Sequence, residues 1–170
     1  MERREHDTVF GIFGSGKEAA EVELLASELG VLNRSLFMMG DVSKDQIPEI
    51  LSAATICTSL FVPLKEMEGN SANKFFDALA ASRPIAINYG GWQAESIRND
   101  RIGILLDPYN MAAAATTLID FLDQPATDQQ SVGEAAGRVG RERFARDQIS
   151  LRVLNAIVAA TDSELPNRAM

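Results

Sequence analysis

Five short, almost continuously apolar runs recur along the chain, and they alternate with longer segments whose apolar residues return every three or four positions. The runs are TVFGIF (8–13), RSLFMM (34–39), TICTSLF (55–61), PIAIN (84–88) and RIGILLD (101–107). Short apolar runs of this kind are typical of strands that are covered on both faces. The alternation predicts an α/β fold built on a doubly wound parallel sheet.

The segments between the runs have the spacing of helices. We predict helices over 17–29, 43–53, 71–82, 91–99 and 110–124, followed by two more over 127–143 and 147–162. No strand candidate follows residue 107, so the fold should end in a helical C-terminal tail. A chain of 170 residues supplies one sizeable core. Residues 1–170 are therefore expected to form a single domain.

The amino-acid composition disfavours several kinds of partner and catalytic site. The formal net charge of -8 argues against nucleic acid as a partner, because phosphate neutralisation needs clustered Lys and Arg. His6 and Cys57 are the only histidine and cysteine, which disfavours disulfides, Cys/His metal sites and a Ser-His-Asp triad. No apolar run approaches the roughly 20 residues of a membrane span, and the N-terminus lacks a signal-peptide pattern. We expect a cytoplasmic protein without a membrane span.

A glycine-rich stretch, GIFGSGKEAA (11–20), follows the first strand candidate. Residues 11–17 have the spacing of a Walker A phosphate loop, but Glu18 stands where a Ser or Thr would bind magnesium. Gly14 and Gly16 also fit a dinucleotide fingerprint, which requires an acidic residue at the end of the next strand. That strand candidate is followed by Gly40 and only then by Asp41.

Two interpretations of Gly14 and Gly16 therefore stay open. They contact a phosphate or a sugar, as in the NAD-binding modules that carry this fingerprint, or they form a tight strand-to-helix turn.

The stretch NSANKFFDALAAS (70–82) predicts a helix that begins near Asn70 or Ser71, either of which can cap it. Lys74 lies in its first turn, where the positive end of the helix dipole already favours an anion, and this combination suits a diphosphate. Asp77 lies about one turn further on, where a carboxylate can accept hydrogen bonds from ribose hydroxyls. The alternative is that Lys74 and Asp77 form an exposed ion pair.

A third loop, NYGGWQAES (88–96), precedes the next helix. Gly90 and Gly91 allow a ligand to approach the backbone closely, or merely form a turn. Glu95 falls in the first turns of the helix, and Trp92 is expected to be half-buried in a contact between domains or subunits.

Taken in order, these segments resemble the C-terminal, donor-binding half of retaining glycosyltransferases with the GT-B fold, group 1 (glycosyltransferase family 4). The resemblance rests on VFGIFGSGKEAAEVELLASELG, MMGDVSKDQIPEILSAATICTSLF, EMEGNSANKFFDALAASRPIAINYGGWQAESIR and GILLDPYNMAAAATTLIDFLDQP, and it covers nearly the whole chain. Such a half has a Rossmann-like sheet with strand order 3-2-1-4-5-6. Relative to it, this sequence lacks the first strand and helix as well as the N-terminal acceptor domain.

The resemblance also assigns roles to residues. The family carries two Glu separated by seven residues, the first at the transferred sugar and the second at the nucleotide ribose. Asp77 occupies the second position, whereas the first falls on Gly69, so that Glu68 is the nearest carboxylate for it. Lys74 would stabilise the leaving diphosphate, while Asn70, Asn73, Gly90, Gly91 and Glu95 would be further contacts. Ser82 replaces a Gly that is common in the family.

The implied activity is transfer of a hexosyl-type group from a UDP- or GDP-sugar to an acceptor, without a metal or other cofactor, in synthesis of surface polysaccharide or a glycoconjugate. The full-length enzyme would be cytoplasmic or peripheral at the inner face of the membrane. The isolated chain is expected to bind donor weakly and to turn over little.

The alternatives are a non-catalytic nucleotide-binding or interaction domain, an NAD-binding module, and a sugar-nucleotide epimerase, which the single His6 disfavours. Association into a homodimer stays open.

Overall fold

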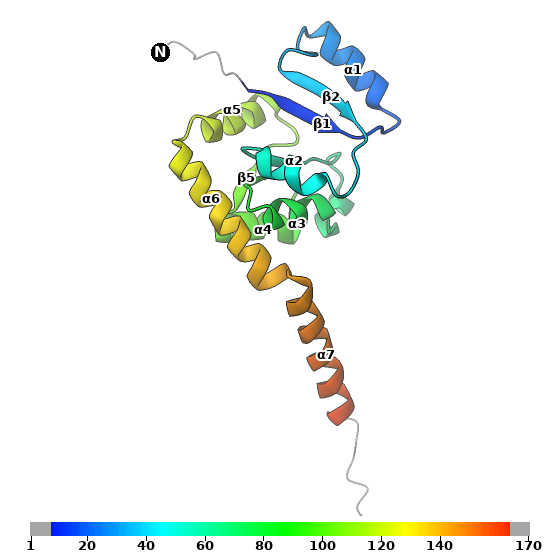
Figure 1. Ribbon diagram of the computed structural model, residues 1–170, viewed down its shortest axis with the longest axis vertical. Helices are drawn as coiled ribbons and strands as arrows, with labels where there is room; N and C mark the ends of the chain where they lie inside the picture. Colours follow the sequence, from blue (N-terminus) through cyan, green and yellow to red (C-terminus); the bar gives the residue numbers. More distant parts are fainter. Residues whose placement is uncertain (1–7, 164–170) are drawn as a thin grey trace, which may run out of the picture. The chain divides into compact units, whose positions relative to one another are not determined.

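The computed structural model describes residues 8–163, and these residues form two compact units that divide between Ile47 and Pro48. Both units consist of parallel strands joined by helices (Figure 1). The predicted α/β class is confirmed, and all five predicted strands are present in the predicted order, each shorter than its apolar run. The strands are shorter because pairing stops where the loops at the sheet edges begin.

The first unit contains β1 (Phe10–Phe13), α1 (Ala19–Glu28) and β2 (Leu36–Gly40). β1 and β2 pair in parallel from Phe10 opposite Leu36, and the register shifts between Ile12 and Phe13. Within residues 8–47, Ala26 is the only residue classed as buried. This unit therefore has little core of its own.

The second unit holds the larger core. Its elements are α2 (Ile47–Ala53), β3 (Cys57–Ser59), the 3-10 helix η1 (Lys65–Gly69), α3 (Asn73–Ala80), β4 (Ile85–Ile87), α4 (Gly91–Asp100), β5 (Gly103–Leu105), α5 (Met111–Leu122), α6 (Ala126–Val139), the π-helical turn η2 (Gly140–Phe144) and α7 (Arg146–Ser163). The strand order is β3-β4-β5, so β4 is the central strand. Its three residues are all buried, and Phe75 and Leu79 of α3 pack against this sheet with no exposed surface.

The strands form two sheets, β1-β2 and β3-β4-β5, and no described register joins β1 to β3. In the order 3-2-1-4-5-6, β1 and β2 correspond to strands 2 and 3, and β3, β4 and β5 correspond to strands 4, 5 and 6. Strand 1 of that order lies between these two groups.

Trp92 is partly buried, as expected, but its contacts lie within the second unit. Its ring packs on Phe75, Phe76 and Phe144 with centroid separations of 5.6, 5.9 and 5.8 Å. Such edge and tilted geometries are favourable for aromatic rings. This cluster connects α3, the start of α4 and η2.

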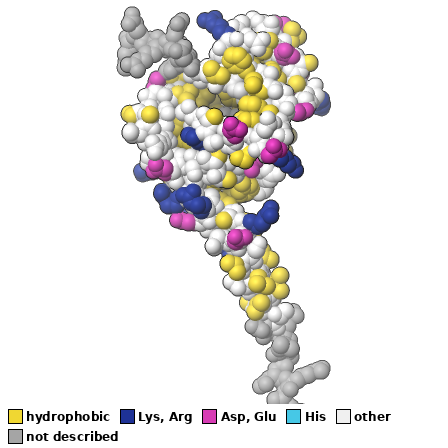
Figure 2. Space-filling model, in the orientation of Figure 1, with side chains coloured by type: hydrophobic (Ala, Val, Ile, Leu, Met, Phe, Trp, Pro, Cys, Tyr) yellow, Lys and Arg dark blue, Asp and Glu magenta, His cyan; other side chains and the backbone are white. Residues whose placement is uncertain are grey.

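The predicted helical tail is present as α6, η2 and α7. Arg143 in η2 makes two hydrogen bonds of 2.6 Å to the carboxylate of Asp100, which joins η2 to the end of α4. α7 continues beyond this turn (Figure 1), and Figure 2 shows hydrophobic side chains along it. Ile149, Leu154 and Ile157 are 44%, 54% and 57% exposed. None of the helices within residues 8–163 is long and apolar enough to cross a membrane.

Candidate functional site

Two loops at the carboxyl end of the three-stranded sheet are in direct contact. η1, which follows β3, lies against the N-terminus of α4, which follows β4. A Cβ on Gly91 would be 1.9 Å from the carbonyl oxygen of Glu68, and Gly91 has φ +78°, a value that suits glycine. A Cβ on Gly90 would lie 3.3 Å from the carboxylate of Glu68. The glycine pair therefore makes room for Glu68.

A cavity of about 470 Å³ lies beside this contact. It is formed by the loops after β3, β4 and β5 together with α4, and its lining residues are Pro63, Leu64, Lys65, Glu68, Asn88, Tyr89, Gly90, Arg98, Leu105, Leu106, Pro108 and Tyr109. Carboxyl ends of parallel strands are where α/β proteins bind ligands. The cavity combines apolar surface with two cationic side chains, Lys65 and Arg98, and one carboxylate, Glu68. It can hold a small polar ligand.

Asn88 fixes the geometry of these loops. Its amide nitrogen donates to the carbonyl of Phe61 at 2.8 Å, and its amide oxygen accepts from the Phe61 backbone N–H at 2.9 Å. The side chain thus extends the pairing of β3 and β4 beyond their last residues. Tyr109 reaches the same loop, because its hydroxyl lies 3.4 Å from the carbonyl oxygen of Pro63.

A buried polar network lies beneath Tyr89. Its hydroxyl donates to Gln93 Oε1 at 2.8 Å and lies 3.2 Å from Ser59 Oγ, and both of these residues are almost fully buried. Burial raises the pKa of the Tyr89 hydroxyl, an effect that the hydrogen bond with Ser59 partly offsets. Tyr89 therefore stays protonated at neutral pH and serves as a hydrogen-bonding support for the cavity.

The first turn of α3 differs from the prediction. The N-cap residue is Ala72, and no side chain accepts a hydrogen bond from the helix start, so capping by Asn70 or Ser71 was wrong. The physical reason is that η1 ends at Gly69 and leaves Asn70 extended, which moves the helix start to Asn73. The N–H of Phe75 donates to the Ala72 carbonyl at 3.0 Å, whereas the N–H groups of Asn73 and Lys74 remain available to an external acceptor.

Lys74 and Asp77 both lie on the exposed face of α3, opposite the buried Phe75 and Leu79. The alternative interpretation was an exposed ion pair between Lys74 and Asp77. Both side chains are exposed, but no ion pair joins them. The ion pair found among residues 8–163 joins Arg143 to Asp100. Each charge is thus available for a ligand.

The remaining predicted residues are spread over both units. Asn73 is the first residue of α3 and is exposed, Asn70 precedes it and is partly exposed, and Glu95 is exposed in α4. Lys74, Asp77, Asn70, Asn73 and Glu95 do not line the 470 Å³ cavity, whereas Glu68 and Gly90 do.

Gly14 and Gly16 lie in the first unit, in the loop between β1 and α1. Gly14 has φ +137°, and its N–H donates to the Gly40 carbonyl at 2.7 Å. A Cβ on either glycine would meet no atom within 4 Å, so the space over the loop is open. Ser15 Oγ donates to the carboxylate of Asp41, which directly follows β2.

Sequence reasoning missed Lys65, Arg98 and Tyr109. Tyr109 could have been found, since it follows the last strand, and loops after parallel strands form ligand sites. No pattern marked Arg98, which comes from the last turn of α4. Among residues 8–163, no three or more His, Cys, Asp or Glu side chains are grouped so that they could hold a metal ion.

Comparison with known proteins identifies the family. The family model of "Glycosyl transferases group 1" matches residues 1–139. The chain belongs to the group 1 glycosyl transferases. A 2-deoxystreptamine glucosyltransferase from Streptomyces kanamyceticus is 28% identical over 120 residues, which are 71% of this chain and 30% of that protein.

Solved structures of glycosyltransferases share the fold. Sucrose-phosphate synthase from Thermosynechococcus elongatus matches with a TM-score of 0.73 and 16% identity over 91% of this chain and 39% of its own. Anabaena Alr3699/HepE in complex with UDP and glucose matches with a TM-score of 0.67 and 16% identity over 92% and 41%. The chain thus has the fold of part of a GT-B glycosyltransferase. The matched residues span 30% of the length of the glucosyltransferase.

Proposed function

We propose that this chain is the C-terminal, donor-binding domain of a retaining group 1 glycosyltransferase of family 4, which takes a hexosyl-type group from a UDP- or GDP-sugar. The observation that carries the proposal is the first turn of α3, where Lys74 has no ion-pair partner among the described residues and no side chain caps the helix. The family match and the UDP-bound state of Alr3699/HepE support a nucleotide-sugar as ligand.

The leaving group explains the need for these residues. Transfer of a glycosyl group develops negative charge on the departing diphosphate, and preorganised donors lower the barrier by stabilising that charge. The Lys74 ammonium and the free N–H groups of α3 supply such donors. Asp77 accepts hydrogen bonds from the ribose hydroxyls.

The transferred sugar would lie near Glu68, beside Gly90 and the cavity. Glu68 Oε1 would lie 3.3 Å from a Cβ on Gly90, so the carboxylate is next to the glycine pair. Asn70, Asn73, Gly91 and Glu95 would add contacts around the sugar and diphosphate. The product would be a surface polysaccharide or another glycoconjugate made in the cytoplasm.

Calorimetric titration of the chain with UDP, GDP and UDP-glucose tests this proposal. We expect one nucleoside diphosphate to bind, and Lys74→Ala and Asp77→Ala each to weaken binding by about 1 kcal/mol or more. Lys44→Ala is a matched control, because Lys44 is exposed and outside the site. Binding that ignores both site substitutions would contradict the proposal.

A second candidate is nucleotide binding without transfer. It is favoured by Gly69, which stands where the family has its first Glu and has no side chain to meet a sugar. The same titration distinguishes the two candidate functions. A sugar contact by Glu68 predicts that UDP-glucose binds more tightly than UDP and that Glu68→Gln removes the difference, whereas a domain without a sugar site binds both equally.

A further inference from the structure

Exposed apolar side chains gather on two loops at the carboxyl end of the three-stranded sheet. Of the six large apolar side chains that are exposed within residues 48–145, five lie in the segments 60–64 and 109–111, which follow β3 and β5: Leu60, Val62, Leu64, Tyr109 and Met111. Tyr109 is the most exposed of them, at 81%. The two loops meet where the Tyr109 hydroxyl lies 3.4 Å from the Pro63 carbonyl oxygen. An apolar rim therefore borders the carboxyl end of the sheet.

The backbone that carries Tyr109 is held in place by side chains. The carboxylate of Asp107 accepts hydrogen bonds from the N–H groups of Tyr109 and Asn110, at 2.8 and 3.1 Å. Asn110 in turn caps α5 by accepting from the Ala113 N–H. A tyrosine side chain has only two rotatable bonds before its hydroxyl, so little conformational entropy is lost when a ligand packs on the ring. Tyr109 thus presents an aromatic surface whose position the protein fixes in advance.

The ring borders the same space as a carboxylate. Tyr109 lines the 470 Å³ cavity together with Glu68 and Gly90. Aromatic walls with a few well-placed polar groups are typical of small-molecule sites. A pyranose ring carries hydroxyl groups around its edge and C–H groups on its two faces, so it needs both kinds of surface. The Glu68 carboxylate can accept hydrogen bonds from sugar hydroxyls, and the Tyr109 ring can pack against a C–H face.

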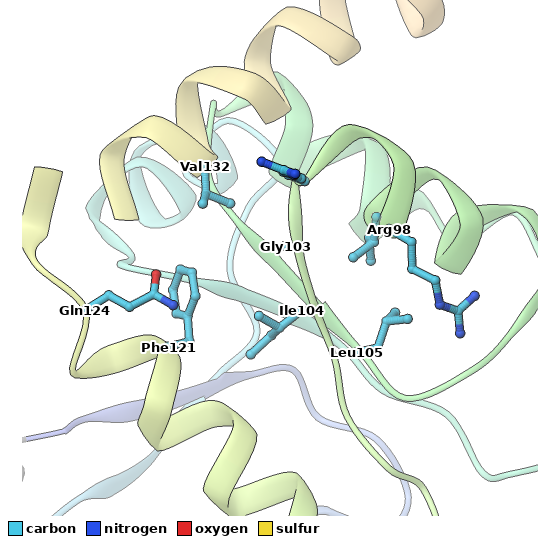
Figure 3. Close-up of a pocket in the computed structure, with 9 residues that line it drawn as sticks. Arg98, Gly103, Ile104, Leu105, Phe121, Gln124 and Val132 are labelled. Carbon is cyan, nitrogen blue, oxygen red and sulfur yellow. The ribbon is translucent and has the colours of Figure 1, made fainter. Parts of the chain in front are cut away.

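The neighbouring cavity does not offer this combination. A smaller cavity of about 310 Å³ shares Arg98 and Leu105 with the larger one. In Figure 3 these two side chains lie on one side of Ile104, whereas Phe121 and Val132 lie on the other. The lining of the smaller cavity contains no Asp or Glu. Of the two cavities, only the larger one has both an aromatic ring and a carboxylate in its lining.

We propose that the C–H face of the transferred pyranose packs on the ring of Tyr109, an inference that rests on the proposed nucleotide-sugar function. The diphosphate and ribose contact α3, so Tyr109 determines the affinity for the sugar and not for the nucleotide. The ring, and not the hydroxyl, carries this role, because 3.4 Å is longer than a usual O–H···O hydrogen bond.

The test is calorimetric titration of the whole chain with UDP, GDP, UDP-glucose and GDP-glucose. Tyr109→Ala should weaken binding of the sugar nucleotide about three- to tenfold, the loss expected for an aromatic contact, without weakening binding of the matching diphosphate. Tyr109→Phe retains the ring and should restore the affinity for the sugar nucleotide. Met111→Ala is the matched control, because it removes another exposed apolar side chain from the rim but does not line the cavity.

The inference is overturned if Tyr109→Ala weakens the sugar nucleotide no more than the matching diphosphate, or no more than Met111→Ala does. The nucleotide site on α3 would stand in that case. If neither a diphosphate nor a sugar nucleotide binds, the proposed function fails, and methyl glucoside then tests Tyr109 separately. Saturable shifts of the ring resonances of Tyr109, one of two tyrosines in the chain, would support sugar packing. Unshifted ring resonances would overturn this inference as well.

Discussion

Gly91 is the residue on which the contact between η1 and α4 depends most directly. Its φ of +78° and the Glu68 carbonyl at 1.9 Å from the position of a Cβ leave no room for a side chain. We predict that Gly91→Ala lowers the free energy of unfolding by about 2–4 kcal/mol, because backbone must move on one side of the contact.

Urea unfolding followed by circular dichroism measures this change. Gly69→Ala is the control, since a Cβ there would meet no atom within 4 Å. An equal loss of stability in the two variants would show that general loop effects, and not the Glu68 contact, determine the result.

Ser82 has a backbone conformation that favours glycine. Its φ is +54°, in the left-handed region. Ser82→Gly should therefore raise the free energy of unfolding by about 0.5–1 kcal/mol, the relief of strain being larger than the added entropy of the unfolded chain. Thermal and urea unfolding check this, and a loss of stability would mean that the Ser82 side chain makes a net favourable contact.

At the scale of elements, the strands and the order of helices could be predicted because their signals are local. Apolar runs of five to seven residues marked β1 to β5, and helical spacing marked α1 to α7. The start of α3 could not be predicted, because it depends on where the preceding 3-10 helix ends, and nothing in LKEMEG indicates that turn. The absence of a Lys74–Asp77 ion pair could not be predicted either, because side chains on an exposed helix face can adopt several rotamers.

α5 offers a test of an element whose cap is clear. The side chain of Asn110 accepts a hydrogen bond of 3.0 Å from the Ala113 N–H. We predict that Asn110→Ala lowers the free energy of unfolding by about 1 kcal/mol. Asn99→Ala, at an exposed position within α4, should be close to neutral, and a similar loss in both variants would contradict a capping role.

At the scale of the whole molecule, the sequence predicted the α/β class but not the division into two units. That division follows from which strands pair, and strand pairing between distant segments is not encoded in local periodicity. Two of the residues singled out from the sequence, Glu68 and Gly90, line the 470 Å³ cavity, whereas Lys65, Arg98 and Tyr109 reach it from loops or helix ends that carried no motif.

The unequal cores of the two units predict unequal local stability. Only Ala26 is buried within residues 8–47, whereas all three residues of β4 are buried in the second unit. Amide hydrogen exchange should therefore be faster in β1 and β2 than in β4, because sparsely buried segments open at lower free-energy cost. Equal protection of these strands would contradict the prediction.

The proposed function requires that the first turn of α3 binds the diphosphate of a nucleotide-sugar. The most direct measurement is the shift of the Asn73 and Lys74 backbone amide resonances during titration of the chain with UDP and GDP, with uridine and guanosine as controls. We predict saturable shifts with one of the diphosphates and none with its nucleoside, because only the phosphates accept hydrogen bonds from these N–H groups. If a diphosphate binds while both amides stay unshifted, the binding site lies elsewhere and α3 does not hold the diphosphate.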